Sequence, residues 1–433
     1  MTVTGRGLDS GQRSETVRRS NLSALLQALH VDSPLTRSDL GERTGLTRSA
    51  IGRLVGELAA AGLVREEPGD SAGSPGRPSP YVSVEPDAAV ALAFEIAVDS
   101  VAIAVVGLGG HVHERIRVDR PRHPATPDEI VADLVELADV AGPRWHGKPV
   151  VGIGVAVVGV VRRDDGFVST APNLGWRDVP LGEKLSNAIG MTVPVVVANE
   201  ADLGAVAEHR RGAAAEVDDV IFLSAEVGVG GGLIVGGQPL TGVAGHGGEV
   251  GHLPVNPVHG ARCRCGSIGC WETEIGEEAL LARAGRPTDG GTAAVEAVLA
   301  DAAAGDPGAL AAVDHVGRWL GIGLAGLVNV LNPSRIVLGG RLARIYPFVS
   351  ASLHAELDER SLVSHLAAVD VVPAILGVDA PLLGAAEMAL EPILNDPARW
   401  IPRPTNIVEP PARRSSRRAR RDGVHTVLDK QGV

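Results

Sequence analysis

The sequence predicts an α/β body over residues 88–395, preceded by a small α+β domain of the winged helix-turn-helix type over residues 13–85. Two observations carry this prediction. The N-terminal part has leucines at i, i+3, i+4 and i+7, followed by short helical segments that end in glycine. From Val90 the pattern changes to strands such as ALAFEIAV and SVAIAVVG, which then alternate with helical segments.

The N-terminal domain should contain three short helices. The first has an apolar stripe formed by Leu22, Leu25, Leu26 and Leu29. Thr36 and Asp39 have the spacing of a capping box and should start the second helix, and Gly45 supplies a sharp turn. Thr47 should cap the third helix, which ends at Gly62 and whose buried residues are Ile51, Leu54, Val55 and Leu58. This order is typical of a helix-turn-helix.

The third helix and the segment after it suit DNA. Two short strands, at residues 63–65 and Tyr81–Val84, flank a Gly/Pro/Ser-rich tip and so resemble a wing. The first turn of a recognition helix meets base edges in the major groove, and an arginine at a wing tip suits a narrow minor groove. The candidate DNA contacts are Thr47, Arg48, Ser49, Arg53 and Arg77. A helical protein-interaction module is the alternative interpretation.

All three cysteines lie within eight residues, in a C-x-C-x₄-C pattern. With a histidine eleven residues upstream they make a Cys₃His set, which suits tetrahedral Zn²⁺. Four protein ligands leave no open position for water, so we expect a structural ion. Buried, unligated cysteines are the alternative, and a disulfide would leave one thiol unpaired. The predicted ligands are His252, Cys263, Cys265 and Cys270.

The same stretch carries a resemblance to a known family. GGEVGH followed by CRCGSIGCWE resembles the zinc-binding signature of the ROK family of bacterial sugar kinases and repressors, and much of residues 90–390 is similar in order. Gly76-Arg77-Pro78 also resembles a motif common in ROK repressors. The resemblance implies an actin-like (ribonuclease H-like) two-lobed sugar-kinase fold for the body, with a sugar site between the lobes.

The resemblance also implies which side chains bind the sugar. Sugar hydroxyls need carboxylates and amides that accept and donate together. The family motifs place such groups at Asn173, Asn199, Glu200, Glu249, His252 and Glu272. The effector is then a sugar or a sugar phosphate, and a structural zinc would fix the loop that carries His252 and Glu272.

Against the kinase pattern, both phosphate loops are altered. Asp-x-Gly-Gly-Thr appears here as Glu95–Asp99, without its glycines and with a carboxylate at its end. Gly-Thr-Gly-x-Gly-Gly-Gly appears as Glu226–Gly232, with its first glycine acidic and its threonine replaced by Val227. Glu200 stands at the catalytic Asp position, one methylene longer. We therefore expect no catalytic residue and no enzyme, but a sugar-responsive transcriptional regulator, most simply a repressor. The alternative is an active ATP-dependent sugar kinase with an accessory DNA-binding domain.

Charge separates the parts of the chain. Its net charge is −12, yet residues 1–80 hold 10 Arg and 9 Asp+Glu, and residues 399–433 hold 9 Lys+Arg against 3 acids. The acidic body argues against nucleic acid lying across it. Residues 396–433 should form a disordered basic tail. No apolar stretch predicts a signal peptide or a membrane span, so a cytoplasmic location and no membrane partner are expected.

A glycine-rich helix around 317–331 should pack closely against a neighbour, which the sequence leaves open as the same chain or a second subunit. ROK repressors resemble one another in being oligomers, which implies a homodimer or homotetramer suited to palindromic operator DNA. The effector sugar, the operator and the sign of regulation do not follow from the sequence.

Overall fold

A computed structural model describes residues 10–68, 79–122, 124–362 and 369–401. They belong to one compact unit that ends at Ile401. Arg77 and the arginine run of the predicted tail lie outside the described residues. Within the described part of the chain, no helix combines the length and apolar character that crossing a bilayer requires.

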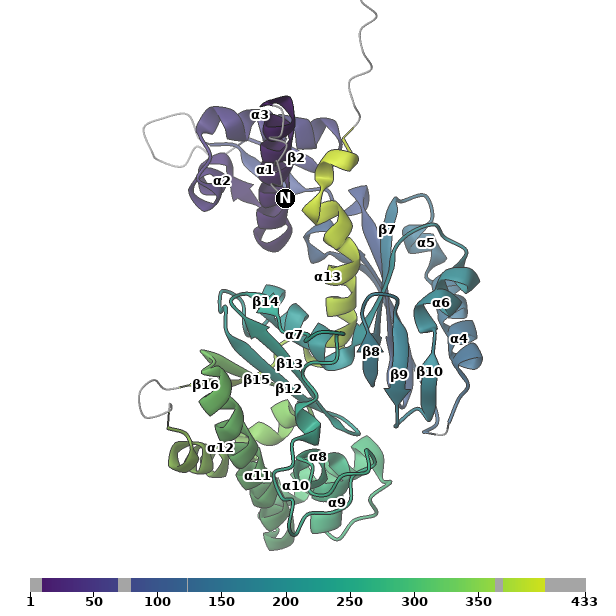
Figure 1. Cartoon of the computed structure of the whole chain (residues 1–433), viewed down its shortest axis with the longest axis vertical. Helices are drawn as coiled ribbons and strands as arrows, with labels where there is room; N and C mark the ends of the chain where they lie inside the picture. Colours follow the sequence, from purple (N-terminus) through teal and green to yellow (C-terminus); the bar gives the residue numbers. More distant parts are fainter. Residues whose placement is uncertain (1–9, 69–78, 123, 363–368, 402–433) are drawn as a thin grey trace, which may run out of the picture. The chain divides into compact units, whose positions relative to one another are not determined.

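The N-terminal elements are three helices and a three-stranded antiparallel sheet (Figure 1). They are α1 (Ser10–Asp32), β1 (Leu35–Thr36), α2 (Arg37–Thr44), α3 (Arg48–Ala60), β2 (Val64–Glu67) and β3 (Tyr81–Val84). The predicted helices and both predicted wing strands are confirmed. Strand β1, which pairs with β3, is not predicted, because two residues are too few to show an alternating pattern.

Local chemistry fixes the ends of α2 and α3. Thr36 Oγ1 accepts the Asp39 N–H at 3.1 Å, and the Asp39 carboxylate accepts the Thr36 N–H at 2.9 Å, which confirms the capping box. Gly45 ends α2 with a φ of 68°, a left-handed conformation that glycine adopts without strain. The predicted apolar positions of α1 and α3 are all fully buried, namely Leu22, Leu25, Leu26, Leu29, Ile51, Leu54, Val55 and Leu58.

The body contains two five-stranded sheets. The first has the order β11-β7-β4-β5-β6 and comprises β4 (Val90–Ile96), β5 (Ser100–Gly107), β6 (Val112–Asp119), β7 (Val150–Val157) and β11 (Val195–Asn199). Every residue of β4 and β5 is buried, as expected of strands covered on both faces. Helices α4 (Pro127–Val140), α5 (Gly142–Trp145) and α6 (Leu181–Ile189) belong to this part of the chain (Figure 1).

One predicted strand is divided in two. The sequence predicts a single strand over residues 150–161, but β7 ends at Val157 and β8 (Val160–Arg162) begins a small antiparallel sheet. Gly159 lies at the break with a φ of 120°, which directs the chain out of the first sheet. The small sheet is completed by β9 (Phe167–Ala171) and β10 (Trp176–Val179).

The second five-stranded sheet has the order β14-β13-β12-β15-β16. Its strands are β12 (Val220–Ala225), β13 (Val229–Val235), β14 (Gln238–Pro239), β15 (Arg335–Gly340) and β16 (Asp370–Pro373). The helices of this part are α8 (Glu272–Ile275), α9 (Glu277–Arg283), α10 (Gly291–Ala303), α11 (Pro307–Leu331) and α12 (Arg341–Arg360). Buried apolar side chains of α8 to α12 and of this sheet form one core around Trp271.

Three glycines of α11 have close neighbours within the same chain, whereas a Cβ on Gly326 would meet nothing within 4 Å. A Cβ on Gly317 would lie 2.3 Å from Ser352 Oγ, and one on Gly321 would lie 2.4 Å from the Leu353 carbonyl, both on α12. A Cβ on Gly323 would lie 2.1 Å from the indole of Trp271. The small residues therefore admit α12 and the tryptophan that follows the last cysteine.

Two helices join the parts of the chain. Helix α7 (Glu200–Arg211) leads from β11 of the first sheet to β12 of the second. The apolar stretch at residues 381–390 predicts a last helix, and helix α13 (Ala380–Asn395) extends beyond it and packs against α7 and against β4 and β7. Its additional turn buries Ile393 and Leu394 in one cluster with the leucines of α1.

The segment just after α13 is structured where the sequence predicts the start of the tail. Residues Pro397–Arg399 form a short 3-10 helix, and Asp396 is paired with Arg19 of α1. The remaining tail, from residue 402, lies outside the described residues.

Candidate functional site

The predicted metal ligands come together. The ligand atoms of His252, Cys263, Cys265 and Cys270 all lie within 4.8 Å of one another. Cys263 Sγ is 3.6 Å from His252 Nδ1, and Cys265 Sγ is 3.6 Å from Cys270 Sγ, too far for a disulfide. Zn–S bonds of about 2.3 Å at tetrahedral angles place neighbouring sulfurs roughly 3.8 Å apart. The four side chains therefore have the spacing of one tetrahedral metal site.

Trp271 fixes the cysteine loop to the body. Its side chain is fully buried, its indole Nε1–H donates to the Trp319 carbonyl at 2.8 Å, and its ring lies on Gly323. Its backbone N–H donates to the Leu253 carbonyl at 2.8 Å, one residue after His252. The residues on either side of Trp271 are a metal-ligand candidate, Cys270, and a sugar-ligand candidate, Glu272. The tryptophan thus determines where both side chains lie.

Three of the predicted sugar ligands surround this loop. Glu272 Oε1 lies 2.8 Å from Cys263 Sγ and 3.6 Å from His252 Nδ1. A Cβ on Gly228 would lie 3.1 Å from Glu272 Oε2 and 3.4 Å from Asn173 Nδ2, so both side chains border the same glycine. Glu272, His252 and Asn173 therefore lie together, although Asn173 comes from the first part of the body.

Glu200 and Glu249 extend this group. Glu200 Oε2 is shielded from solvent and accepts no hydrogen bond from the described residues. Burial raises the pKa of Glu200 to about 8; its own backbone N–H offsets part of this rise, and the charges of Glu249, Glu95 and Asp202 add to it. Burial also raises the pKa of Glu249, and the charge of nearby Glu272 adds to this rise. The structure therefore places these two carboxyls in one neighbourhood with the loop residues.

Asn199 lies at the end of β11, as the sequence predicts, and its amide also bonds groups of the protein itself. Its Oδ1 accepts the N–H groups of Ala201 at 2.8 Å and Asp202 at 3.4 Å, which caps α7, and its Nδ2 donates to the Gly159 carbonyl at 3.0 Å. Its side chain therefore holds the start of α7 in place. Asp202, which is not among the predicted residues, is buried on this first turn, and burial raises its pKa to about 7 against the lowering effect of Arg163.

A chain of ion pairs occupies the altered phosphate loops. Arg122 bonds Asp99 at 2.9 Å and Glu277 at 2.7 Å. Arg341 pairs with Glu277 and lies 3.8 Å from Glu226. The side chains of Glu277 and Arg341 are 2% and 6% exposed, so the central ion pair of this series is shielded from water. We call Asp99, Arg122, Glu277, Arg341 and Glu226 the ion-pair chain.

The ion-pair chain could not be predicted from the sequence. Asp99 and Glu226 are identified as unusual only when the sequence is compared with the kinase pattern. The arginines of the ion-pair chain, and Glu277 at the start of α9, are separated by long stretches of sequence and have no periodic spacing. Nearby, Arg117 bonds Glu95 at 2.8 Å, so the first altered loop contributes a second paired carboxylate.

The glycines that remain from the second loop serve packing. Gly230 to Gly232 lie in β13, where a Cβ on Gly230 would lie 2.8 Å from Ala201 Cβ and one on Gly232 would lie 2.5 Å from the Ala201 carbonyl. Strand β13 and the first turn of α7 are therefore in direct backbone contact. This agrees with the predicted role in close packing.

The predicted DNA contacts of α3 are on its surface. Thr47 caps the helix by accepting the Ala50 N–H at 3.4 Å and lies 3.2 Å from Ser49 Oγ. Arg48 and Ser49 are exposed, and Arg53 is 61% exposed with Glu57 at 3.5 Å. Arg77 lies outside the described residues. The first turn of α3 thus presents a cation and hydroxyls on one exposed surface.

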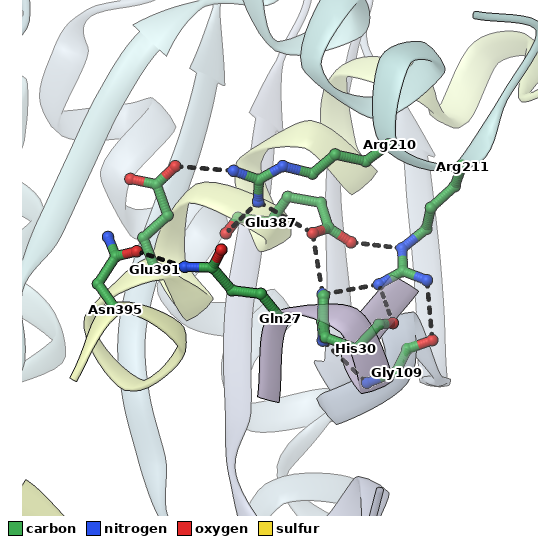
Figure 2. A network of polar contacts seen from close by, with 8 residues as sticks. All are labelled: Gln27, His30, Gly109, Arg210, Arg211, Glu387, Glu391 and Asn395. Carbon is green, nitrogen blue, oxygen red and sulfur yellow. Dashed lines mark hydrogen bonds and ion pairs between the residues drawn. The ribbon is translucent and has the colours of Figure 1, made fainter. Parts of the chain in front are cut away.

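A buried polar network joins α1 to the body (Figure 2). His30 Nδ1 accepts the Gly109 N–H at 3.0 Å, and His30 Nε2 lies 2.9 Å from Glu387 Oε2 and 2.6 Å from Arg211 Nη2. Arg211 bonds the other oxygen of Glu387 and donates to the carbonyls of Gly109 and His30, each at 3.0 Å. Arg210 donates to Glu387 Oε2 at 3.1 Å. We call His30, Arg210, Arg211 and Glu387 the buried network.

The buried network holds a permanent charge. Glu387 is 2% exposed and His30 is 1% exposed. Burial by itself would raise the pKa of Glu387, but the hydrogen bond from His30 and the charges around it hold the pKa well below its usual range. The carboxylate therefore stays ionised between two arginines. Both lie in the last turn of α7, where the helix dipole also stabilises cations.

Comparisons with known proteins agree with both parts of the architecture. Residues 91–391 match the ROK family, and residues 19–73 match the MarR family. The xylose repressor of Bacillus subtilis (strain 168) is 30% identical over 384 residues, which cover 88% of this chain and 97% of that protein.

Two solved structures extend the comparison. A ROK family transcriptional regulator, described as a homologue of the E. coli MLC protein, superposes with a TM-score of 0.73 at 26% identity and covers 89% of this chain and 99% of its own. A ROK family glucokinase from Streptomyces griseus, in complex with glucose and AMPPNP, has a TM-score of 0.61 at 30% identity and covers 70% of this chain and 99% of its own. The matched residues, fold and motifs together establish that the chain belongs to the ROK family.

Proposed function

We propose that this protein is a sugar-responsive DNA-binding transcriptional repressor. Residues 13–85 would bind operator DNA, and residues 88–395 would bind the sugar. The observation that carries the proposal is the exposed first turn of α3, with Arg48 and Ser49, in one chain with the group of sugar-ligand candidates. Similarity to a xylose repressor over 88% of the chain supports it, since the glucokinase similarity covers only the body.

The body would bind sugar without phosphorylating it. A kinase needs a carboxylate base beside the sugar hydroxyl and donors that cradle the phosphates. With a pKa of about 8, Glu200 is largely protonated at pH 7 and can donate a hydrogen bond to a sugar hydroxyl. Arg122 and Arg341, the arginines of the ion-pair chain, already bond carboxylates and so do not cradle a phosphate. We therefore infer that the protein is not an enzyme.

The Cys₃His cluster would hold a structural Zn²⁺. Three thiolates and one imidazole match the preference of zinc, and four protein ligands leave no position for a reacting water. His252 would bind the ion through Nδ1, which faces Cys263, and leave Nε2 for a sugar hydroxyl. Asn173, Glu200, Glu249 and Glu272 would complete the hydroxyl-binding set.

Helix α7 would carry the signal from the sugar to the DNA-binding domain. Its twelve residues span about 18 Å. Its first turn holds Glu200 and packs on β13, and its last two residues bond Glu387 and, through Arg211, the His30 carbonyl. Sugar binding that displaces the first turn would therefore change the position of α1. The effector must bind the two arrangements unequally.

The proposal includes a homo-oligomer. Two-fold related recognition helices suit a palindromic operator, as in other helix-turn-helix regulators. Binding to operator DNA would place the protein in the cytoplasm.

The function is tested by measuring operator affinity with and without sugar. The zinc-loaded full chain should bind a fluorescent operator from its own upstream region, and one sugar from a panel of pentoses, hexoses and amino sugars should change that affinity by roughly 5–150-fold. ATP should have no effect, and no sugar phosphate should form. ATP-dependent phosphorylation of a panel sugar would instead support the kinase alternative.

Arg48→Ala should weaken operator binding by about 1–3 kcal/mol if Arg48 contacts a guanine. The side chain is exposed at the first turn of α3, so the fold should not change. Fluorescence anisotropy at several salt concentrations measures the effect. Arg144→Ala is the matched control, because it removes the same charge from a 60% exposed position in the body. Equal affinities for both variants would show that α3 does not read the operator.

A further inference from the structure

Phosphate binding needs donors that are free to point at the anion. Proteins supply them as arginine or lysine side chains and as backbone N–H groups at helix starts or glycine loops. In this chain, the three arginines at the altered phosphate loops already bond carboxylates. Arg117 bonds Glu95, and Arg122 and Arg341 belong to the ion-pair chain.

The carboxylates in this region exceed the cations. Four carboxylates, Glu95, Asp99, Glu226 and Glu277, surround three arginines, and they lie close enough to influence one another. The sugar-ligand candidates add Glu249 and Glu272 without adding a permanent cation. A phosphate on a sugar bound among these residues would therefore meet an excess of carboxylates over cations.

Two further arginines lie close to the sugar-ligand candidates, and both interact with other residues of the protein. Arg264 donates to Asn173 Oδ1 at 2.7 Å and pairs with Glu278. Arg163 contacts Met388 Sδ at 3.7 Å and its charge offsets that of the buried Asp202, although its Nε has no hydrogen-bond partner among the described residues. A phosphate would have to draw Arg264 away from Glu278 and Arg163 away from the charge of Asp202.

We propose that the site selects an uncharged sugar and discriminates against the phosphate ester of the same sugar, and that the ion-pair chain is the reason. This inference rests on the proposed sugar-sensing function. It narrows the effector class from sugars and sugar phosphates to unphosphorylated sugars. Neutral hydroxyls can donate to the carboxylates of this region, whereas a phosphate dianion has no proton to donate to them and is repelled by their charge.

Isothermal titration calorimetry on the zinc-loaded full chain tests the selection with matched pairs. The probes are D-glucose with glucose 6-phosphate, N-acetyl-D-glucosamine with its 6-phosphate, and D-xylose with xylose 5-phosphate. For a pair that binds, the free sugar should bind at least about tenfold tighter than its phosphate. The difference should shrink at high salt, because it arises from charge.

A double variant, Asp99→Asn with Glu226→Gln, tests the cause. It removes the two negative charges that pair with Arg122 and Arg341 at the ends of the ion-pair chain, while the central Glu277 keeps both arginines in place. The phosphate should gain about tenfold in affinity, and the free sugar should keep its affinity, which also shows that the variant is folded. Leu362→Ala changes an exposed side chain of the body and is the control for effects of substitution and purification that do not involve the ion-pair chain.

The outcomes separate this inference from the proposed function. A phosphate that binds as tightly as its free sugar would overturn the selection and leave sugar sensing intact. An unchanged ratio in the double variant would overturn the role of the ion-pair chain. If neither member of any pair binds or alters operator affinity, the proposed sugar sensing fails, and the selection fails with it.

Discussion

Glu387→Gln should lower the free energy of unfolding by about 3–5 kcal/mol, because it leaves two largely buried guanidiniums without their carboxylate. The amide oxygen can still accept from His30 Nε2, but it cannot neutralise Arg210 and Arg211. Glu387 is ionised in the folded protein, so the loss should be full at neutral pH. Urea unfolding followed by circular dichroism and by tryptophan fluorescence measures it.

In the same variant, sugar binding should no longer change the affinity for operator DNA. Sugar affinity should persist, since Glu387 lies at the opposite end of α7 from Glu200. The sugar-induced change in operator affinity should fall toward onefold, because α7 no longer holds α1 through the carboxylate. Glu391→Gln is the matched control: Glu391 also bonds Arg210 but is 40% exposed, so its loss should cost about 0–1 kcal/mol. If the two variants unfold alike and respond alike, the buried network does not connect the sites.

Cys270→Ser should abolish stoichiometric zinc binding and sugar affinity together. A neutral serine hydroxyl is a poor replacement for a thiolate in a site of this kind, and a structural zinc contributes directly to folding. Without the ion, no metal coordination would tie His252 to the three cysteines that precede Glu272 in the loop. Elemental analysis of the purified protein and calorimetry with the effector sugar measure the two losses.

Operator binding without sugar should survive in Cys270→Ser, because the core that holds α1 to α3 contains no residue of the cysteine loop. Val258→Ala, at a 77% exposed position between His252 and Cys263, should keep both zinc and sugar affinity. Removing zinc from the unaltered protein with a chelator and restoring it should reproduce the loss and its recovery. Full sugar affinity in zinc-free protein would contradict a positioning role for the ion.

Local chemistry explains which features the sequence could predict. The capping box at Thr36 and Asp39 and the turn at Gly45 depend on residues a few positions apart, so their spacing is sufficient. The metal ligands are confined to residues 252–270, so composition alone predicts the site. The phosphate loops needed a family pattern, because the loss of a glycine is informative only against the sequence that is expected.

Features built from distant residues could not be predicted. His30 and Glu387 are 357 positions apart, and Arg122 and Glu277 are 155 apart. No periodicity connects such residues, since their contact depends on the whole fold. For Asn199 the motif was identified, but the bond of its amide to the Gly159 carbonyl, 40 positions away, depends on the fold. The glycines of α11 predicted a close neighbour without identifying it as α12 and Trp271.

The last turn of α13 limits how this protein can be divided into fragments that fold by themselves. Leu390, Ile393 and Leu394 are buried among the leucines of α1, so the DNA-binding domain completes its hydrophobic core with residues from the other end of the chain. A fragment that ends near residue 85 would expose that part of the core to water. The domain is therefore not a portable module, and a chimera that transfers its operator specificity to another sensor should carry the matching face of the C-terminal helix with it.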